Sequence, residues 1–401
     1  MRGAGLLVVA LLVVALIAAA PGSASAEPYR LRADAFATAA DPSGFVMLQA
    51  EAREQGAVFV DAEALVWTGV GLDSADDPEA RGEAVLASVR LRDPARYVDA
   101  RLGRLFYQGG AVRPLHMDGA AVGFRSPTGA TAEVFGGIPV APGSIGRSND
   151  WLVGFRSAQS IAGMASVGFS YWQERDGGRL AHSEIGVEGS VAPTRAIALY
   201  TTTALDTIDF GVAEARIAGT VHDATKRLEV YGLRRNPSRL LPATSLFAAL
   251  GSYDADEGGL RGSYRVAPRL ELSASATIES VGGEPGATQL VRAELWLDDD
   301  GKGALGAEAR RSSIPDASFS GARAWLRIPF LPQLTGSAEG EVAIPDEPRG
   351  RGFVWPWGLF AARYMPAPWV DVAAGFEIGS TPQYATVIGG LLRATGQWGV
   401  P

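Results

Sequence analysis

The stretch QLVRAEL at residues 289–295 alternates apolar and polar or ionic side chains residue by residue. Arg292 and Glu294 point to one side of an extended chain, while Val291 and Leu295 point to the other, because successive side chains of a β-strand lie on opposite faces. This stretch therefore predicts a strand with one charged face and one apolar face.

The same alternation recurs from residue 29 to the end of the chain, for example at 60–66, 85–92, 322–328 and 370–377. Proline-containing turn signals separate the segments, and short connections roughly alternate with longer, more polar ones such as 113–118. The stretch 238–253 could be a loop, or could contain a further strand or a helix. We count about 22 such segments, the first near 29–38 and the last near 383–397. Because a β-strand pattern fills the whole mature chain, the fold is expected to be all-β.

The composition narrows the functional classes. The chain has 401 residues, a formal net charge of −8 and no cysteine. The negative charge argues against nucleic acid as a partner, since phosphate binding needs a basic surface. The absence of cysteine excludes disulfides and thiolate metal sites, and no motif for a cofactor is found. No cofactor or metal is therefore expected.

The N-terminus has the features of a secretory signal. Residues 5–20 form an apolar segment, Pro21 and Gly22 end it, and Ala24-Ser25-Ala26 matches the small-x-small cleavage pattern. The alternative is a permanent membrane anchor, for which about 16 residues are short. We expect residues 1–26 to be a cleaved signal peptide and residues 27–401 to be a single exported domain.

Strand length and residue type favour a membrane barrel over a soluble sandwich. The segments run about 9–12 residues, which suits a tilted membrane crossing, and their apolar face is rich in small aliphatic residues. Aromatic residues cluster near predicted strand ends, as in Phe106-Tyr107, Tyr171-Trp172 and 353–357, where interfacial girdles lie. The prediction is a single closed antiparallel transmembrane β-barrel of about 16–22 strands; a soluble sheet with one solvated face is the alternative.

The charged strand face is the candidate functional feature. An arginine facing lipid at the bilayer midplane costs roughly 2–4 kcal/mol, so these side chains are expected to face water inside the barrel. The candidate lumen-lining residues are Arg90, Arg92, Asp99, Arg101, Glu184, Glu188, Arg261, Arg265, Arg292, Glu294, Glu308, Arg310, Arg323, Arg327, Glu339, Glu341, Asp371 and Glu377.

One part of the chain resembles a known family. Residues 98–107 (VDARLGRLFY), followed by HMDGAAV at 116–122, resemble the strand–loop–strand pattern of Gram-negative porin families, including alginate-export-type barrels. In those proteins a Leu-Gly-Arg strand precedes a loop, and an Asp-Gly opens the next strand. The resemblance covers about 25 residues and implies an outer-membrane porin-like channel. Such barrels usually end on an aromatic residue, whereas here Trp398 is followed by three more residues.

A few residues outside the charged strand face could carry other chemistry. His182 shares a predicted face with Glu184, but no serine is placed to form a nucleophilic site, so no enzyme is expected. The run 298–303 (DDDGKG) resembles a calcium loop faintly but sits where a hairpin turn is expected. The acidic residues of 73–79 could bind divalent cations that bridge lipopolysaccharide, or form a solvated loop.

These observations favour an integral protein of the bacterial outer membrane. The leading hypothesis is a channel for passive diffusion of small hydrophilic solutes, because charges of both signs share one strand face. The chain begins its strands soon after Glu27, which leaves no room for a plug domain and favours passive behaviour. The alternative is a non-conducting barrel with a structural or surface-interaction role; an outer-membrane enzyme is a weaker third. The expected partners are outer-membrane lipid, lipopolysaccharide and small solutes, with a possible homo-oligomer.

Overall fold

The computed structural model describes most of the expected mature domain. The described residues are 29–38, 43–70, 81–111, 113–140, 150–236, 239, 254–314, 318–347, 352–381 and 386–399. The expected signal peptide, the acidic loop at 73–79 and nearly all of the 238–253 connection lie outside these residues.

Strands account for nearly all of the described residues. Their bounds are β1 Tyr29–Thr38, β2 Gly44–Gln55, β3 Phe59–Val70, β4 Arg81–Arg92, β5 Val98–Tyr107, β6 Leu115–Arg125, β7 Ala130–Pro139, β8 Trp151–Ile161, β9 Ala165–Asp176, β10 Arg179–Thr194, β11 Ile197–Asp206, β12 Gly211–His222, β13 Lys226–Arg235, β14 Ala255–Ala267, β15 Leu270–Val281, β16 Glu284–Trp296, β17 Ala304–Ser312, β18 Phe319–Leu331, β19 Leu334–Pro345, β20 Trp355–Ala367, β21 Val370–Gly379 and β22 Val387–Gly399.

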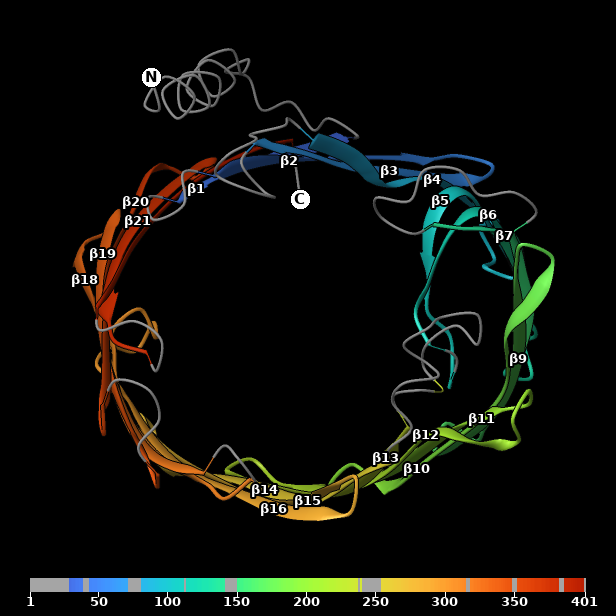
Figure 1. Cartoon of the computed structure of the whole chain (residues 1–401). Helices are drawn as coiled ribbons and strands as arrows, with labels where there is room; N and C mark the ends of the chain where they lie inside the picture. Colours follow the sequence, from blue (N-terminus) through green and yellow to red (C-terminus); the bar gives the residue numbers. More distant parts are fainter. Residues whose placement is uncertain are drawn as a thin grey trace.

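The strands form one closed antiparallel sheet. Each strand pairs with its neighbours in sequence, and β22 pairs antiparallel with β1, so the 22-stranded sheet has no free end. Figure 1 shows the resulting ring. The predicted all-β closed barrel is confirmed, at the upper end of the expected strand count. Among the described residues, no helix has the length and apolarity needed to cross a bilayer.

The wall has two chemically distinct faces. Cross-strand register places Arg292 opposite Glu308 and Glu308 opposite Arg323, whereas Ala307 lies between Ala293 and Ala324 on the other side of the same strands. We call the first face the polar face and the second the apolar face. The apolar face carries exposed large residues such as Val291, Leu305 and Phe376.

One part of the wall bends toward the barrel axis. Figure 1 shows the ends of β5 and β6 lying inside the line of β7 and β9. The bend coincides with a row of three glycines in register, Gly103, Gly119 and Gly137. A Cβ on Gly119 would lie 2.2 Å from the Gly136 carbonyl oxygen, and Gly103 has a φ of +119°. Glycine is therefore required at this crease.

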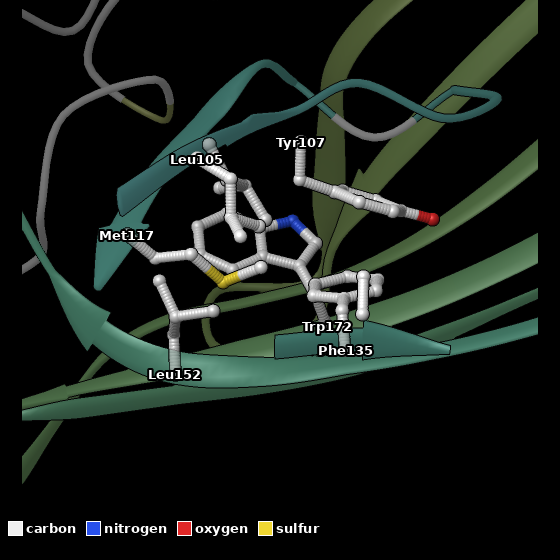
Figure 2. Close-up of a cluster of buried hydrophobic side chains, with 8 residues drawn as sticks. Leu105, Tyr107, Met117, Phe135, Leu152 and Trp172 are labelled. Carbon is white, nitrogen blue, oxygen red and sulfur yellow. The ribbon is translucent and has the colours of Figure 1, made fainter. Parts of the chain in front are cut away.

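The bent ends of β5 and β6, together with the connection 108–114, form the interior hairpin. It packs on the inner side of β7–β9 and buries a small apolar core (Figure 2). The core consists of Leu105, Tyr107, Leu115, Met117, Ala121, Phe135, Leu152 and Trp172.

This core corrects two sequence-based expectations. Tyr107 and Trp172 were expected in interfacial girdles, but they are 0% and 1% exposed, because both belong to the polar face that the interior hairpin covers. The longer loop expected at 113–118 is also shorter than predicted. β6 begins at Leu115, since Leu115 and Met117 pair with β5 and are buried under the hairpin.

Candidate functional site

Ion pairs cross the strands on the polar face near the interior hairpin. Arg90 on β4 donates to Asp99 on β5 from Nε and Nη2, which form one edge of the guanidinium group. Arg101 on β5 lies 2.5 Å from Glu133 on β7, so this pair spans the intervening β6. Arg92 pairs with Asp61 on β3. The ion pairs therefore connect neighbouring strands and also strands that are separated by one other strand.

The opposite part of the ring carries a second set of ion pairs. Arg323 lies 2.7 Å from Glu339, and Arg310 pairs with Glu341 across β18. Asp371 accepts from Arg363 at 3.0 Å and from Arg393 at 2.8 Å, so one carboxylate joins β20, β21 and β22.

The remaining predicted residues differ in their partners. Arg292 pairs with Glu294 on its own strand, and Arg265 is 4.0 Å from Glu271. Arg327 donates to the carbonyls of the β16–β17 turn, and Glu377 accepts from the Trp357 indole at 3.2 Å. Within the described residues, Arg327 and Glu377 make only these hydrogen bonds and no ion pair, and Arg261 and Glu308 make no ion pair either.

The interior hairpin is anchored by a buried ionic contact. Arg113, in the β5–β6 connection, pairs with Glu184 on β10, whose carboxylate also accepts from the Trp172 indole at 2.9 Å. The Arg113 guanidinium stacks over the Trp172 ring at 5.4 Å and donates to the Arg239 carbonyl. Burial lowers the pKa of Arg113 to about 10, so it is charged at neutral pH. Breaking such a buried pair leaves an uncompensated charge.

A cavity of about 320 Å³ lies on the polar face at the end of the barrel with short turns. Its lining includes six arginines but only two acids, Asp99 and Glu133; the arginines are Arg90, Arg92, Arg96, Arg101, Arg125 and Arg156. Arg156 pairs with Glu188 on β10. Two of the six, Arg96 and Arg125, have no ion pair among the described residues, so the cavity carries an excess of positive charge.

The three histidines have different surroundings. His182 is buried against Trp172, with ring centroids 5.4 Å apart, whereas His222 is exposed at the end of β12. His116 lies on β6, next to β4. In the described part of the chain, no three His, Asp or Glu side chains are grouped to hold a metal. The run 298–303 is a turn in which Asp298 accepts from the amides of Lys302 and Gly303, as predicted.

Sequence reasoning missed the interior hairpin and its anchor. The available signal was large apolar residues on the polar face of adjacent strands, since Phe135 is two residues from Glu133 and Leu152 is four residues from Arg156. Arg113 gave no signal, because it lies in a connection whose partner is on β10.

Comparisons with known proteins identify the fold. No protein-family model matches the sequence, and no curated protein matches it significantly. The siderophore receptor PirA from Pseudomonas aeruginosa has a similar structure, with a TM-score of 0.58 and 11% identity, covering 94% of this chain and 81% of that chain. The P pilus usher PapC translocation pore matches at a TM-score of 0.52 and 9% identity, covering 93% and 99%.

A further match is to the usher-containing P pilus assembly intermediate of E. coli, at a TM-score of 0.58 and 9% identity. It covers 94% of this chain, which spans 62% of that chain. At these identities the likeness is one of fold: the chain is a large closed β-barrel of the kind found in these proteins.

Proposed function

We propose that this protein is an outer-membrane barrel, exported with removal of residues 1–26, that forms a water-filled channel for passive diffusion of small hydrophilic solutes. In this proposal the polar face lines the lumen and the apolar face contacts acyl chains. The lumen-lining residues are then those predicted from the sequence, from Arg90 and Arg92 on β4 to Asp371 and Glu377 on β21.

The observation that carries the proposal is the separation of the two faces. Ion pairs join strand to strand on one face, while Val291, Leu305 and Phe376 are exposed on the other. Exposed apolar residues in a continuous band suit lipid contact rather than water. The interior hairpin supports the inward placement of the charges, because Phe135, on which it packs, shares a face with Glu133.

The interior hairpin gives this channel a narrowed part. It occupies one side of the ring and holds Arg113 and Glu184 between the hairpin and the wall. The wall opposite the hairpin carries its ion pairs on the polar face, toward the part of the lumen that the hairpin leaves open. A solute would therefore pass between the hairpin and the opposite wall, past charges of both signs.

Reconstitution into planar lipid bilayers tests the proposal. The refolded barrel, checked by its slower or faster migration on unheated detergent gels, is expected to give stepwise conductance that scales with salt concentration. A correctly folded barrel that inserts but gives no conductance steps would contradict it.

The interior hairpin also favours a second candidate function, a non-conducting barrel with a structural or surface-interaction role. In that case the hairpin and the paired charges on the polar face close the lumen. The same bilayer experiment separates the two, since this candidate requires insertion without conductance and without solute uptake into liposomes.

A further inference from the structure

β4 and β5 separate where the interior hairpin begins. Their register contains six residue pairs, from Ala87 opposite Arg104 to Arg92 opposite Asp99. Beyond these pairs, β4 continues with β3 as its partner, and β5 continues with β6. We call the boundary between the unpaired parts of β4 and β5 the β4–β5 seam. It is a break in the hydrogen-bonded wall.

Along the edge of β4 that β5 does not pair with, side chains provide hydrogen bonds to the β4 backbone. The Arg104 Nη1 donates to the Ala84 carbonyl at 2.7 Å, and the His116 Nε2 donates to the Val85 carbonyl at 2.7 Å. The His116 ring also stacks on Phe106, with centroids 4.4 Å apart. Backbone groups inside a bilayer must be hydrogen-bonded, and these contacts provide donors for two carbonyls at the edge of β4. Because both donors are side chains, the edge of β4 can become free without any change in strand pairing.

The seam carries charge on the apolar face. Arg104 and Asp118 are opposite each other in register, next to Leu102, which is 66% exposed, and Phe106, which is 51% exposed. Asp118 accepts from Arg104 in a bidentate pair at 2.7 and 2.8 Å, yet its side chain remains 45% exposed. The pair lies midway along the strands, in register with Ala64 and Ala87.

An ion pair at this height is unfavourable against acyl chains. The unfavourable contact disappears if the seam holds water that is continuous with the barrel interior. It is also removed when a polar headgroup lies against Arg104 and Asp118. The neighbouring Phe106 and Leu102 would then meet the apolar part of the same molecule.

We propose that the β4–β5 seam is a lateral opening through which a zwitterionic amphiphile moves between the barrel interior and the bilayer. This inference rests on the proposed placement of the barrel in a membrane. Arg104, which also lies 3.4 Å from Glu83, binds the anionic group of the headgroup and Asp118 binds its cationic group, because the pair presents both charges side by side. His116 and Arg104 close the opening when they hold the β4 carbonyls.

Cysteine labelling tests the opening, since the chain has no native cysteine. In reconstituted vesicles, F106C is expected to react with a charged, membrane-impermeant maleimide from the barrel interior and also with a lipid-confined maleimide from the bilayer, because the opening connects the two. L102C, on the same strand and face but opposite Val89, and F376C, on the apolar face of β21, are expected to stay unreactive toward the impermeant reagent. Reaction of F106C with only one of the two reagents, or with neither, would overturn the opening.

The ligand class is tested with dodecylphosphocholine below its solubilising concentration. It is expected to slow labelling of F106C, whereas dodecyl maltoside and inorganic phosphate are not, and R104Q is expected to abolish the protection. R104K, which keeps the charge, checks that a loss in R104Q is not a folding defect. Equal protection by all three probes would overturn the zwitterionic assignment.

A reference pair separates failure of this inference from failure of the proposed function. R323C on the polar face and A324C on the apolar face of β18 lie far from the seam. If R323C reacts and A324C does not, the barrel is inserted as proposed, and an unreactive F106C then contradicts only the lateral opening. If A324C reacts like R323C, the membrane placement itself fails.

Discussion

The wall from β14 to β20 and the wall from β4 to β9 follow the same alternating pattern but have different shapes. β15 and β16 pair without interruption from Leu270–Leu295 to Val281–Glu284, and no residue of β14–β16 belongs to the buried core. β5 and β6 instead leave β4, cross a row of glycines and bury aromatic residues inside the barrel.

The difference shows what bends a barrel wall inward. Alternation of polar and apolar residues alone gives a wall without an inward bend, because each face of the sheet then has a single kind of surrounding along its whole length. Inward bending needs two further features: glycines in register, which remove side chains on the concave side, and large apolar residues on the polar face, which the bent hairpin buries. Gly119 and Phe135 supply these features on adjacent strands.

The largest expected effect comes from filling the crease. In Gly119→Val, the new side chain meets the Gly136 carbonyl oxygen, which would be 2.2 Å from the Cβ. Backbone cannot yield as a flexible side chain does, so the cost should exceed the roughly 1–3 kcal/mol of ordinary core overpacking, because the strands must separate at the crease. We expect little or no folded barrel on unheated detergent gels. Gly340→Val, whose Cβ meets nothing within 4 Å, is the matched control and should fold.

Removing the anchor of the interior hairpin should have a smaller effect on folding but a clear effect on conductance. In Glu184→Ala, Arg113 loses its ion pair with Glu184 but keeps its hydrogen bond to the Arg239 carbonyl. The loss of stability should therefore stay below the roughly 3–5 kcal/mol of breaking a fully buried pair, as measured by urea unfolding in detergent. The hairpin is expected to leave the wall and the single-channel conductance to rise. Glu341→Ala removes an ion pair from the regular wall and should leave conductance nearly unchanged; an equal rise in both variants would refute the role of the hairpin.

The arginine-rich cavity predicts a moderate change in ion selectivity. Arg96 and Arg125 add positive charge there without acidic partners, so replacing both with glutamine should lower the anion-to-cation permeability ratio. Reversal potentials in a salt gradient measure this ratio, and the change should shrink at high salt because exposed charges are screened. A ratio that stays constant at low salt would mean that solutes do not pass this cavity.

The smallest expected effect is in a turn that is far from the crease. The amide of Thr225, then the amide of Lys226 and the hydroxyl of Thr225, lower the pKa of Asp223 from its ordinary value of 3.8. The folded state therefore gains stability from the carboxylate above that value and loses it as the pH falls through the lowered pKa. Asp223→Ala should be slightly less stable than the parent at pH 7 and equal to it in strong acid; a difference that persists there would have another cause.

Much of the barrel could be predicted from the sequence, because alternation is a local property of each strand. Arg292 and Ala293 show their opposite faces without knowledge of any partner. The crease could not be predicted in this way. Gly103, Gly119 and Gly137 lie on three strands, and their common row depends on cross-strand register.

The candidate site was likewise predicted only in part from the sequence. Which residues carry charge on one strand face is readable from the sequence, but which arginine meets which carboxylate is not. Arg101 pairs with Glu133 two strands away, and Arg113 reaches Glu184 across 71 residues of chain. Aromatic residues near strand ends gave the wrong location for Tyr107 and Trp172, since a girdle and a buried core use the same residue types.

Both proposals require the charged side chains to face the inside of a membrane-inserted cylinder. A cysteine scan along β18, from residue 321 to 328, with a membrane-impermeant thiol reagent and conductance as the second readout, tests this orientation most directly. If the polar face lines the lumen, reaction is expected with a period of two, at 321, 323, 325 and 327, each accompanied by a change in conductance. Reaction at 322, 324, 326 and 328 instead, or at all eight positions alike, would contradict it.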